Sequence, residues 1–179
     1  MQDILTITLN PAVDLATSVE HVIAGPKLYC RSPRVDPGGG GVNVARAICK
    51  LGGNAKALVA LGGASGDRLL SLVSAEGVPV HPVPVSGETR ESFAVTDESN
   101  GAQYRFSLPG QTLTPDDGDR LIAEIAANTS DDGYVVLSGG VAPGLGDAYP
   151  ERILAAVTPR TDKLVVDTSK GALARLIAQ

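Results

Sequence analysis

The stretch Val35–Ala47 reads V-D-P-G-G-G-G-V-N-V-A-R-A and places four consecutive glycines directly before a helix-like run. On a helical wheel, one broad arc of this run is apolar, and Asn43, Arg46 and Lys50 share the opposite side. The arc holds Val42, Val44, Ala45, Ile48, Cys49 and Leu51. The pair Gly52-Gly53 is a helix stop. A glycine-rich turn that opens into an amphipathic helix is typical of α/β proteins, which bind ligands at the carboxyl ends of their strands.

Spacing tests whether this turn is a nucleotide-binding motif. A P-loop needs a lysine and a Ser or Thr after its last glycine, and Val42-Asn43 does not supply them. The dinucleotide fingerprint needs a third glycine where Asn43 or Val44 stands. A glycine backbone without side chains and the positive end of the following helix still favour the binding of a ligand at this turn. Asn43 offers both a hydrogen-bond donor and an acceptor to ligand hydroxyls. The alternative, a close helix–sheet contact, explains one or two glycines better than four.

Outward from this turn, the chain alternates strand and helix patterns, which predicts an α/β fold: a mostly parallel sheet with helices on both faces. Strands are predicted at Ile4–Leu9, Ala55–Leu61, Val78–Val85, Tyr134–Leu137 and Lys163–Val166. Further helices are predicted at Asp67–Ala75, from Thr114-Pro115 onward, at Tyr149–Val157 and at Ala172–Ile177. Prolines within Val78–Val85 place that strand at an edge of the sheet.

Two extended segments, about residues 15–36 and 88–108, interrupt the alternation. The part Val22–Val35 contains two prolines and mixed polarity, which suits a sheet that is not covered on both faces. In the second segment, Asn100-Gly101 predicts a hairpin. We expect the two segments to pair as a small β-sheet lid on one partial domain that spans residues 1–179.

Composition narrows the class of protein. The chain has 179 residues, a formal charge of −5, two Phe, four Tyr and no Trp, which argues against a nucleic-acid partner. No apolar run approaches the roughly 20 residues that cross a bilayer, and no signal-peptide pattern begins the chain, so we expect a soluble, cytoplasmic protein without a membrane partner. The two cysteines and two histidines form no disulfide framework and no metal-ligand spacing.

Other polar residues stand at predicted strand ends or in the lid segments. Asp14 follows the first strand and is either an acceptor for hydroxyls or a turn cap. Arg90 and Arg105 suit an anion clamp, or else a solvated strand face. Ser138 and the glycines after it resemble an anion or hydroxyl nest, and Lys27 is otherwise a plain surface lysine. Together these residues favour a small polyol or sugar phosphate bound beneath a lid.

The chain resembles the ribokinase-like PfkB carbohydrate kinases over its whole length. The resemblance rests, in order, on T-L-N-P-A-V-D-L-A-T, the G-G-G-G-V-N-V-A-R-A element, E-T-R, Y-R-F-S-L-P-G, V-V-L-S-G-G-V-A-P-G and V-V-D-T-S-K-G-A-L. Within this family, 1-phosphofructokinases and tagatose-6-phosphate kinases usually carry lysine at the third glycine. Gly40 therefore favours fructose 6-phosphate, phosphorylated at O1 by ATP-Mg to give fructose 1,6-bisphosphate in glycolysis.

The resemblance also implies roles for residues. Asp14, the backbone of Gly38, Gly39, Gly40 and Gly41, and Asn43 match positions that bind sugar hydroxyls. Arg90, with Ser138 or Gly139, matches positions that contact the sugar phosphate and line the site, whereas Lys27 and Arg105 match lid positions near the phosphate or ATP. The lid sheet of the family also forms a homodimer interface. The element S-G-G-V-A-P-G departs from the more usual S-G-S-[LV]-P-P-G at Gly140 and Ala142.

The catalytic motifs of the family do not occur in the sequence. The G-A-G-D motif, whose aspartate is the general base, and the N-x-x-E motif, which helps to place magnesium, are both missing. We therefore expect the N-terminal, sugar-binding part of a kinase, with no catalytic residue and no metal ligand of its own and with ATP and Mg held mainly by a missing half. The alternatives are a non-enzymatic sugar-phosphate binding or regulatory protein, a 1-phosphofructokinase or tagatose-6-phosphate kinase, and a Rossmann-type oxidoreductase, which lacks its fingerprint.

Overall fold

A parallel five-stranded sheet forms the centre of the computed structural model, which describes residues 3–178. The other residues of the predicted domain 1–179 lie outside the described ones. The strand order is β5-β4-β1-β8-β9, and each neighbouring pair is parallel. The strands are β1 (Ile4–Thr8), β4 (Ala55–Leu61), β5 (Val80–Pro84), β8 (Tyr134–Ser138) and β9 (Leu164–Asp167). The proline-containing β5 lies at an edge, as predicted.

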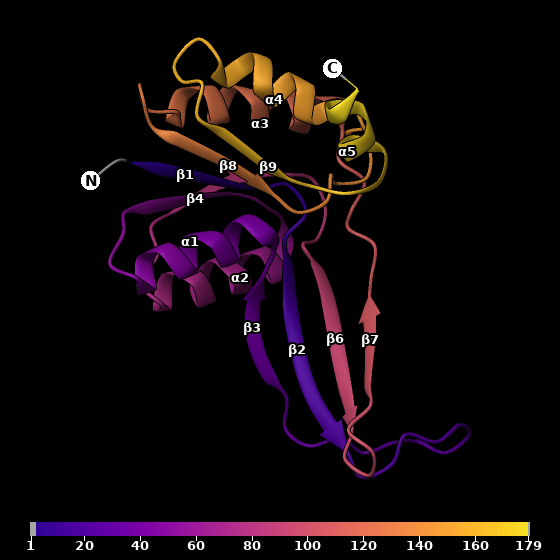
Figure 1. Cartoon of the computed structure of the whole chain (residues 1–179). Helices are drawn as coiled ribbons and strands as arrows, with labels where there is room; N and C mark the ends of the chain where they lie inside the picture. Colours follow the sequence, from indigo (N-terminus) through magenta and orange to yellow (C-terminus); the bar gives the residue numbers. More distant parts are fainter. Residues whose placement is uncertain (1–2, 179) are drawn as a thin grey trace.

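Helices cover both faces of this sheet, which confirms the predicted α/β class (Figure 1). On one face, α1 (Gly40–Lys50) and α2 (Gly63–Ala75) enclose a core with Val42, Leu69 and Val73. On the other face, α3 (Pro115–Asn128) and α4 (Tyr149–Val157) enclose a second core, and α5 (Lys170–Ile177) packs beside α4. No helix among residues 3–178 is both long enough and apolar enough to span a bilayer.

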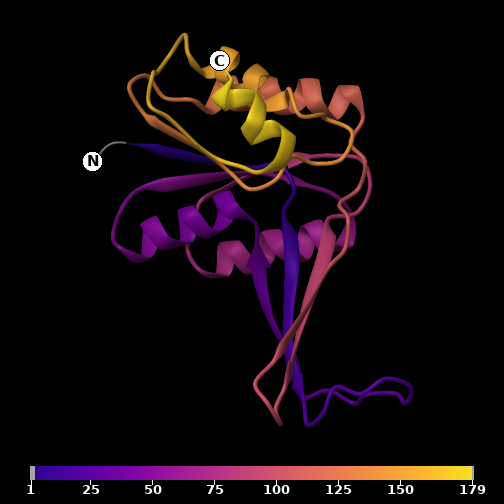
Figure 2. The ribbon, with the colours of Figure 1, turned by 45° about the vertical axis from the view of Figure 1, so that its right-hand side comes forward.

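A second, four-stranded sheet projects from the carboxyl edge of the first (Figures 1 and 2). Its order is β3-β2-β6-β7, with β3 (Arg34–Gly38), β2 (Ala12–Val19), β6 (Arg90–Asp97) and β7 (Gln103–Ser107). The β2–β6 pairing is parallel and joins the two segments that sequence patterns predict to pair. We call this second sheet the lid sheet. The loop of residues 20–33 lies at its far end (Figure 2).

The lid segment before the glycine run differs from its prediction. The extended stretch predicted at Val22–Val35 is mostly a loop, and only its last two residues belong to β3. The first lid strand, β2, begins earlier than the predicted segment 15–36: it starts at Ala12, directly after Asn10-Pro11, and runs to Val19. The Asn10-Pro11 pair follows the end of β1 and leads the chain directly into this new strand. Asp14 therefore lies inside a strand and is not a turn cap.

Two local predictions are confirmed by side-chain contacts. Thr114 caps α3 in a reciprocal capping box with Asp117, and Pro115 is the first helical residue. The Asn100-Gly101 pair forms the turn between β6 and β7. Gly101 has a φ of 74°, and the Asn100 side chain accepts a hydrogen bond from the N–H of Ala102.

Two threonines on the same face of β1 have opposite hydrogen-bonding states. Thr8 is 2% exposed, and its hydroxyl oxygen accepts a hydrogen bond of 2.9 Å from the Val42 N–H in the first turn of α1. Thr6 is fully buried, and its hydroxyl has no hydrogen-bond partner among the described residues. A hydroxyl buried without a partner is a cost to the folded state, whereas Thr8 satisfies one of the amides that a helix start leaves open.

We expect Thr6→Val and Thr8→Val to shift the free energy of unfolding in opposite directions. Thr6→Val removes an unsatisfied hydroxyl without changing the shape of the side chain, so it should stabilise the chain by up to about 1 kcal/mol. Thr8→Val leaves the Val42 N–H buried without an acceptor and should destabilise it by about 1–3 kcal/mol. Urea denaturation of the two variants measures both, and each serves as the matched control for the other. Equal effects of the two variants would contradict this account.

Candidate functional site

The glycine run is packed against the chain itself at each of its four positions. A Cβ on Gly39 would lie 2.6 Å from Thr8 Cγ2, and Gly39 also has a φ of 123°. A Cβ on Gly40 would lie 2.6 Å from the Ser138 carbonyl carbon, and one on Gly41 would lie 2.6 Å from Thr8 Oγ1. A Cβ on Gly38 would collide with the carboxylate of Asp14. The interpretation that close packing explains only one or two of these glycines is therefore wrong.

This packing seats the start of α1 over the carboxyl ends of β1 and β8. Gly40 lies against Ser138 at the end of β8, and Gly41 lies against the backbone of Ile7 in β1. The close approach brings the positive end of α1 to the carboxyl edge of the parallel sheet, where ligands bind in open α/β sheets. The glycines thus place the helix, and the polar side chains around them form the site.

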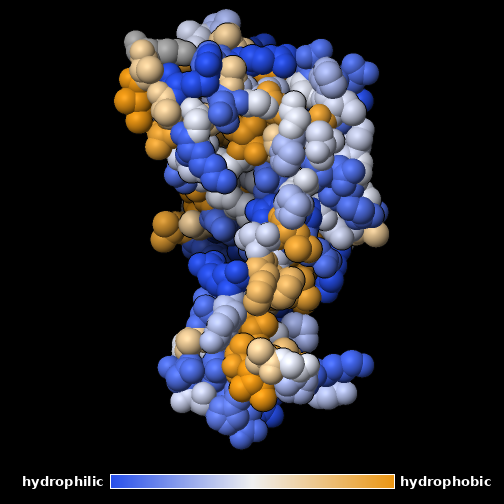
Figure 3. All heavy atoms as spheres, turned by 90° about the vertical axis from the view of Figure 1, so that its right-hand side faces the viewer, coloured by the Kyte–Doolittle hydropathy of each residue, from blue (hydrophilic) through white to orange (hydrophobic). Residues whose placement is uncertain are grey.

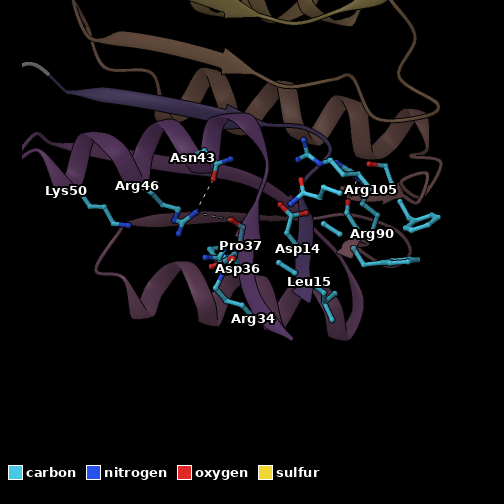
Figure 4. Close-up of a pocket in the computed structure, with 17 residues that line it drawn as sticks. Asp14, Leu15, Arg34, Asp36, Pro37, Asn43, Arg46, Lys50, Arg90 and Arg105 are labelled. Carbon is cyan, nitrogen blue, oxygen red and sulfur yellow. Dashed lines mark hydrogen bonds and ion pairs between the residues drawn. The ribbon is translucent and has the colours of Figure 1, made fainter. Parts of the chain in front are cut away.

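A cavity of about 680 Å³ lies between α1 and the lid sheet (Figure 4). Four of the predicted site residues line it, each from a different element: Asp14 from β2, Asn43 from α1, Arg90 from β6 and Arg105 from β7. This volume falls within the range of about 300–1,000 Å³ that is usual for small-molecule pockets. The chain therefore brings the predicted carboxylate, amide and two guanidinium groups to one polar cavity, which Asp36, Arg34 and Arg46 also line.

Strand register explains why these side chains share a face. Asp14 lies opposite Asp36 of β3 on one side and Ser92 of β6 on the other. Because side chains alternate along a strand, Arg90 and Arg105 fall on this same face of the lid sheet. The sequence patterns did not single out Asp36 and Ser92 as site residues, although both line the cavity. Both alternate with apolar neighbours, but this alternation indicates a shared polar face only once the register of the strands is known.

Burial raises the pKa of Asp14 above its ordinary value. The positive charges of Arg90 and Arg105 and a hydrogen bond from Ser92 oppose that rise, while the negative charge of Asp36 adds to it. The carboxylate is thus a partly desolvated acceptor held between two arginines and a second carboxylate. Such a group is suited to accept hydrogen bonds from ligand hydroxyls, which replace the water that it has lost.

Arg90 is fixed by the segment that precedes it. The Glu88 carboxylate accepts hydrogen bonds of 3.1 Å from both the Ala64 N–H and the Ser65 N–H at the start of α2. The hydroxyl oxygen of Thr89 accepts from the Gly62 N–H. The Arg90 guanidinium then donates to the Ser92 hydroxyl at 3.1 Å and to the Asn10 carbonyl at 3.4 Å. The E-T-R element therefore anchors the chain at two points just before the arginine.

Seven predicted residues lie outside the cavity lining: the four glycines of the run, which pack as described above, and Ser138, Gly139 and Lys27. Ser138 is 3% exposed and donates a 2.9 Å hydrogen bond to the carboxylate of Asp167, so its hydroxyl links β8 to β9 behind the glycine run. Gly139, at a φ of 111°, donates its N–H to the Asp167 carbonyl. Lys27 is exposed in the loop of residues 20–33, at the far end of the lid sheet.

Asp14→Asn should stabilise the ligand-free chain at neutral pH. Because the folded-state pKa of Asp14 is raised, the folded chain binds this proton more tightly than the unfolded chain. Its ionised carboxylate is therefore a cost above the raised pKa, and that cost disappears as the pH falls below the unfolded value of about 3.9. Denaturant unfolding between neutral pH and about pH 4 should show the advantage of the variant shrinking as the pH falls.

Asp97→Asn is the matched control of opposite sign. Hydrogen bonds from the Ser99 side chain and the Val22 N–H lower the pKa of Asp97. Its carboxylate therefore contributes stability above its unfolded pKa, and this contribution is lost as the pH falls through the lowered value. Asp97→Asn should be less stable than the unsubstituted chain at neutral pH. If both variants change stability in the same direction there, the charge argument for Asp14 is wrong.

Comparison with known proteins gives a consistent result along the whole chain. The family model described as pfkB family carbohydrate kinase matches residues 4–179. The ATP-dependent 6-phosphofructokinase isozyme 2 of Mycobacterium tuberculosis is 41% identical over 170 residues, which cover 95% of this chain and 50% of that protein. The chain spans about half the length of the curated relatives it matches.

Solved structures agree with this similarity. Phosphofructokinase-2 from Escherichia coli, in complex with fructose-6-phosphate, matches with a TM-score of 0.93 and 38% identity, over 99% of this chain and 58% of that one. The tetrameric inhibited form of the same enzyme matches with a TM-score of 0.92 and the same identity and coverage. The five-stranded sheet, its helices and the lid sheet thus all have counterparts in solved kinase structures.

Proposed function

Because this chain belongs to the pfkB family of carbohydrate kinases, we propose that it carries the sugar-phosphate-binding side of an ATP-dependent 6-phosphofructokinase. The observation that supports this most is the convergence of Asp14, Asn43 and Arg90 on one polar cavity beside the start of α1. The ligand is fructose 6-phosphate, which binds at the carboxyl edge of the parallel sheet. The whole protein transfers the γ-phosphate of ATP to O1 of this sugar.

Each side chain has a role that its chemistry suits. Asp14 accepts hydrogen bonds from sugar hydroxyls, and Asn43 binds a neighbouring oxygen of the sugar. Arg90 binds the sugar phosphate, because a guanidinium donates two parallel hydrogen bonds to phosphate oxygens. Gly38, Gly39, Gly40 and Gly41 bring backbone to the sugar, and Ser138 with Gly139 forms the floor behind them. Arg105 closes over the ligands from the lid, whereas Lys27 lies at the far end of the lid sheet, away from this cavity.

The described residues do not fit a metal centre. No group of three or more His, Cys, Asp or Glu side chains among residues 3–178 is placed to hold a metal ion. Magnesium, which would supply charge neutralisation for phosphoryl transfer, is therefore assigned to none of residues 3–178. What the chain contributes by itself is binding and orientation of the acceptor sugar.

Isothermal titration calorimetry with fructose 6-phosphate tests the proposal directly. We expect saturable binding at one site, weaker binding of fructose without its phosphate, and no saturable binding of NAD. Tighter binding of fructose 1-phosphate or tagatose 6-phosphate would instead favour a kinase for one of those sugars. A coupled assay with ATP and Mg on the same sample separates a binding or regulatory protein from an active kinase. Absence of any sugar-phosphate binding would overturn the proposal.

We also propose that the lid sheet forms a homodimer. Its face opposite Asp14 is apolar: Phe93 and Phe106 stack with ring centroids 4.8 Å apart, yet they remain 39% and 48% exposed. Tyr104 and Leu108 extend this exposed strip, and Figure 3 shows apolar side chains gathered over the lid-sheet half of the molecule. Sedimentation equilibrium of the chain and of Phe106→Lys tests this assembly. A monomeric unsubstituted chain would overturn it.

A further inference from the structure

Arg46 is held at four points at the edge of the cavity. Its Nε and one terminal nitrogen donate to the two carboxylate oxygens of Glu76 at 2.9 and 2.6 Å. The other terminal nitrogen donates to the Pro37 carbonyl at 3.2 Å and to Oδ1 of Asn43 at 3.1 Å. The side chain is only 18% exposed, and that of Glu76 is 26% exposed. The guanidinium therefore joins the end of α2 to both sides of the glycine run.

This contact decides which way the Asn43 amide faces. A guanidinium has only donors, so the atom of Asn43 that meets it has to be the amide oxygen. The amide nitrogen then points away from Arg46, as Figure 4 shows. One lone pair of the Asn43 oxygen is taken up by Arg46, and the two N–H donors of the amide stay available to a ligand in the cavity. Sequence alone gives Asn43 both a donor and an acceptor, but the structure leaves it mainly a donor.

We infer that Arg46, held by Glu76, is a positioning residue that orients the Asn43 amide so that its N–H groups donate to the sugar phosphate. This inference rests on the proposed function for the identity of the ligand. The group that meets Asn43 has to accept a hydrogen bond, through a hydroxyl or a phosphate oxygen. A freely rotating amide would present either end to the ligand and would lose side-chain entropy on binding. Arg46 removes that cost before the ligand arrives.

A purely structural role for Arg46 makes a different prediction. As a link between α1 and α2 only, the pair with Glu76 would affect folding stability and would leave sugar affinity unchanged. Glu76→Gln separates the two roles, because it removes the charge pair but keeps Arg46 and its contact with Asn43. Arg152→Met is a second control, since Arg152 forms an ion pair with Asp119 that joins α4 to α3 away from the cavity.

The experiment is a double-substitution cycle on fructose 6-phosphate affinity, measured by calorimetry. Arg46→Met should weaken binding about three- to tenfold, the effect of one lost hydrogen bond. Asn43→Ala should weaken it at least as much, and adding Arg46→Met to Asn43→Ala should change the affinity little further. Glu76→Gln should weaken binding less than Arg46→Met, and Arg152→Met should leave it unchanged. Full additivity, or unchanged affinity in Arg46→Met, would overturn the inference.

A ligand-free measurement keeps this test separate from the proposed function. Side-chain ¹⁵N relaxation of the Asn43 NH₂ group should show a rigid amide in the unsubstituted chain and a mobile one in Arg46→Met. An Asn43 amide that is equally mobile in both would overturn the positioning role, even where Arg46→Met failed to bind sugar. If the unsubstituted chain binds no sugar phosphate, the proposed function fails, and the relaxation result still decides whether Arg46 orients Asn43.

Discussion

Gly41→Ala is expected to destabilise the chain by about 1–3 kcal/mol or more, although alanine is the better helix former by about 1 kcal/mol. A methyl group at this position would lie 2.6 Å from Thr8 Oγ1 and 2.7 Å from the Ile7 carbonyl carbon, and closer still to the Ile7 carbonyl oxygen. These atoms belong to β1, the middle strand of the five-stranded sheet, which is hydrogen-bonded on both sides. The backbone there has no room to move aside, so α1 has to lift from the sheet.

Urea denaturation measures this loss, and Gly140→Ala is the matched control. Gly140 lies near the same carboxyl edge, but no atom comes within 4 Å of a Cβ built on it and its φ is not positive. Its substitution should be neutral or stabilising by about 0.4–1 kcal/mol, because alanine narrows the unfolded ensemble. A Gly41→Ala variant as stable as Gly140→Ala would show that the close approach of α1 to β1 is not required.

The sequence predicts the fold class well because the decisive patterns are local. Apolar strand runs, the Thr114-Pro115 cap and the Asn100-Gly101 turn each act over a few residues, and all three form as expected. The strand whose start was not predicted, Ala12–Val19, mixes polar and apolar residues because one of its faces carries the site. A functional face disturbs the very pattern from which a strand is recognised.

The candidate site divides along similar lines. Asp14 and Arg90 meet because β2 pairs with β6 in a fixed register, and nothing near either residue specifies that pairing. The packing role of the four glycines depends on β1, β8 and Asp14, which are remote in sequence. Sequence patterns also could not show that the Ser138 hydroxyl is directed to Asp167, because its partner lies on the neighbouring strand. The sequence shows which residue types are available for a site, but only the folded structure shows which of them are in contact.

The pairing of Asp14 with Arg90 leads to the largest expected effect on ligand binding. Arg90 lowers the pKa of Asp14, against the stronger effect of burial. Arg90 thus has two separable functions in the proposed site: it binds the phosphate through its planar fork, and its positive charge opposes the rise in the pKa of Asp14. Lysine keeps the second function, because it retains the positive charge, but it cannot reproduce the fork.

Arg90→Ala and Arg90→Lys should therefore weaken fructose 6-phosphate binding by different routes. Both lose charge-assisted hydrogen bonds worth about 1.5–3 kcal/mol, which corresponds to about 10- to 150-fold in affinity. In Arg90→Ala the pKa of Asp14 rises further, because burial is less opposed, so its binding should fall off at a higher pH than in Arg90→Lys. Calorimetric titrations across the acidic range measure both effects, with Arg152→Lys as the control for a remote arginine. If Arg90→Ala binds fructose 6-phosphate within about twofold of the unsubstituted chain, which is well under the loss of one such bond, Arg90 does not belong to the site. If Arg90→Ala and Arg90→Lys lose affinity at the same pH, Arg90 does not influence the pKa of Asp14.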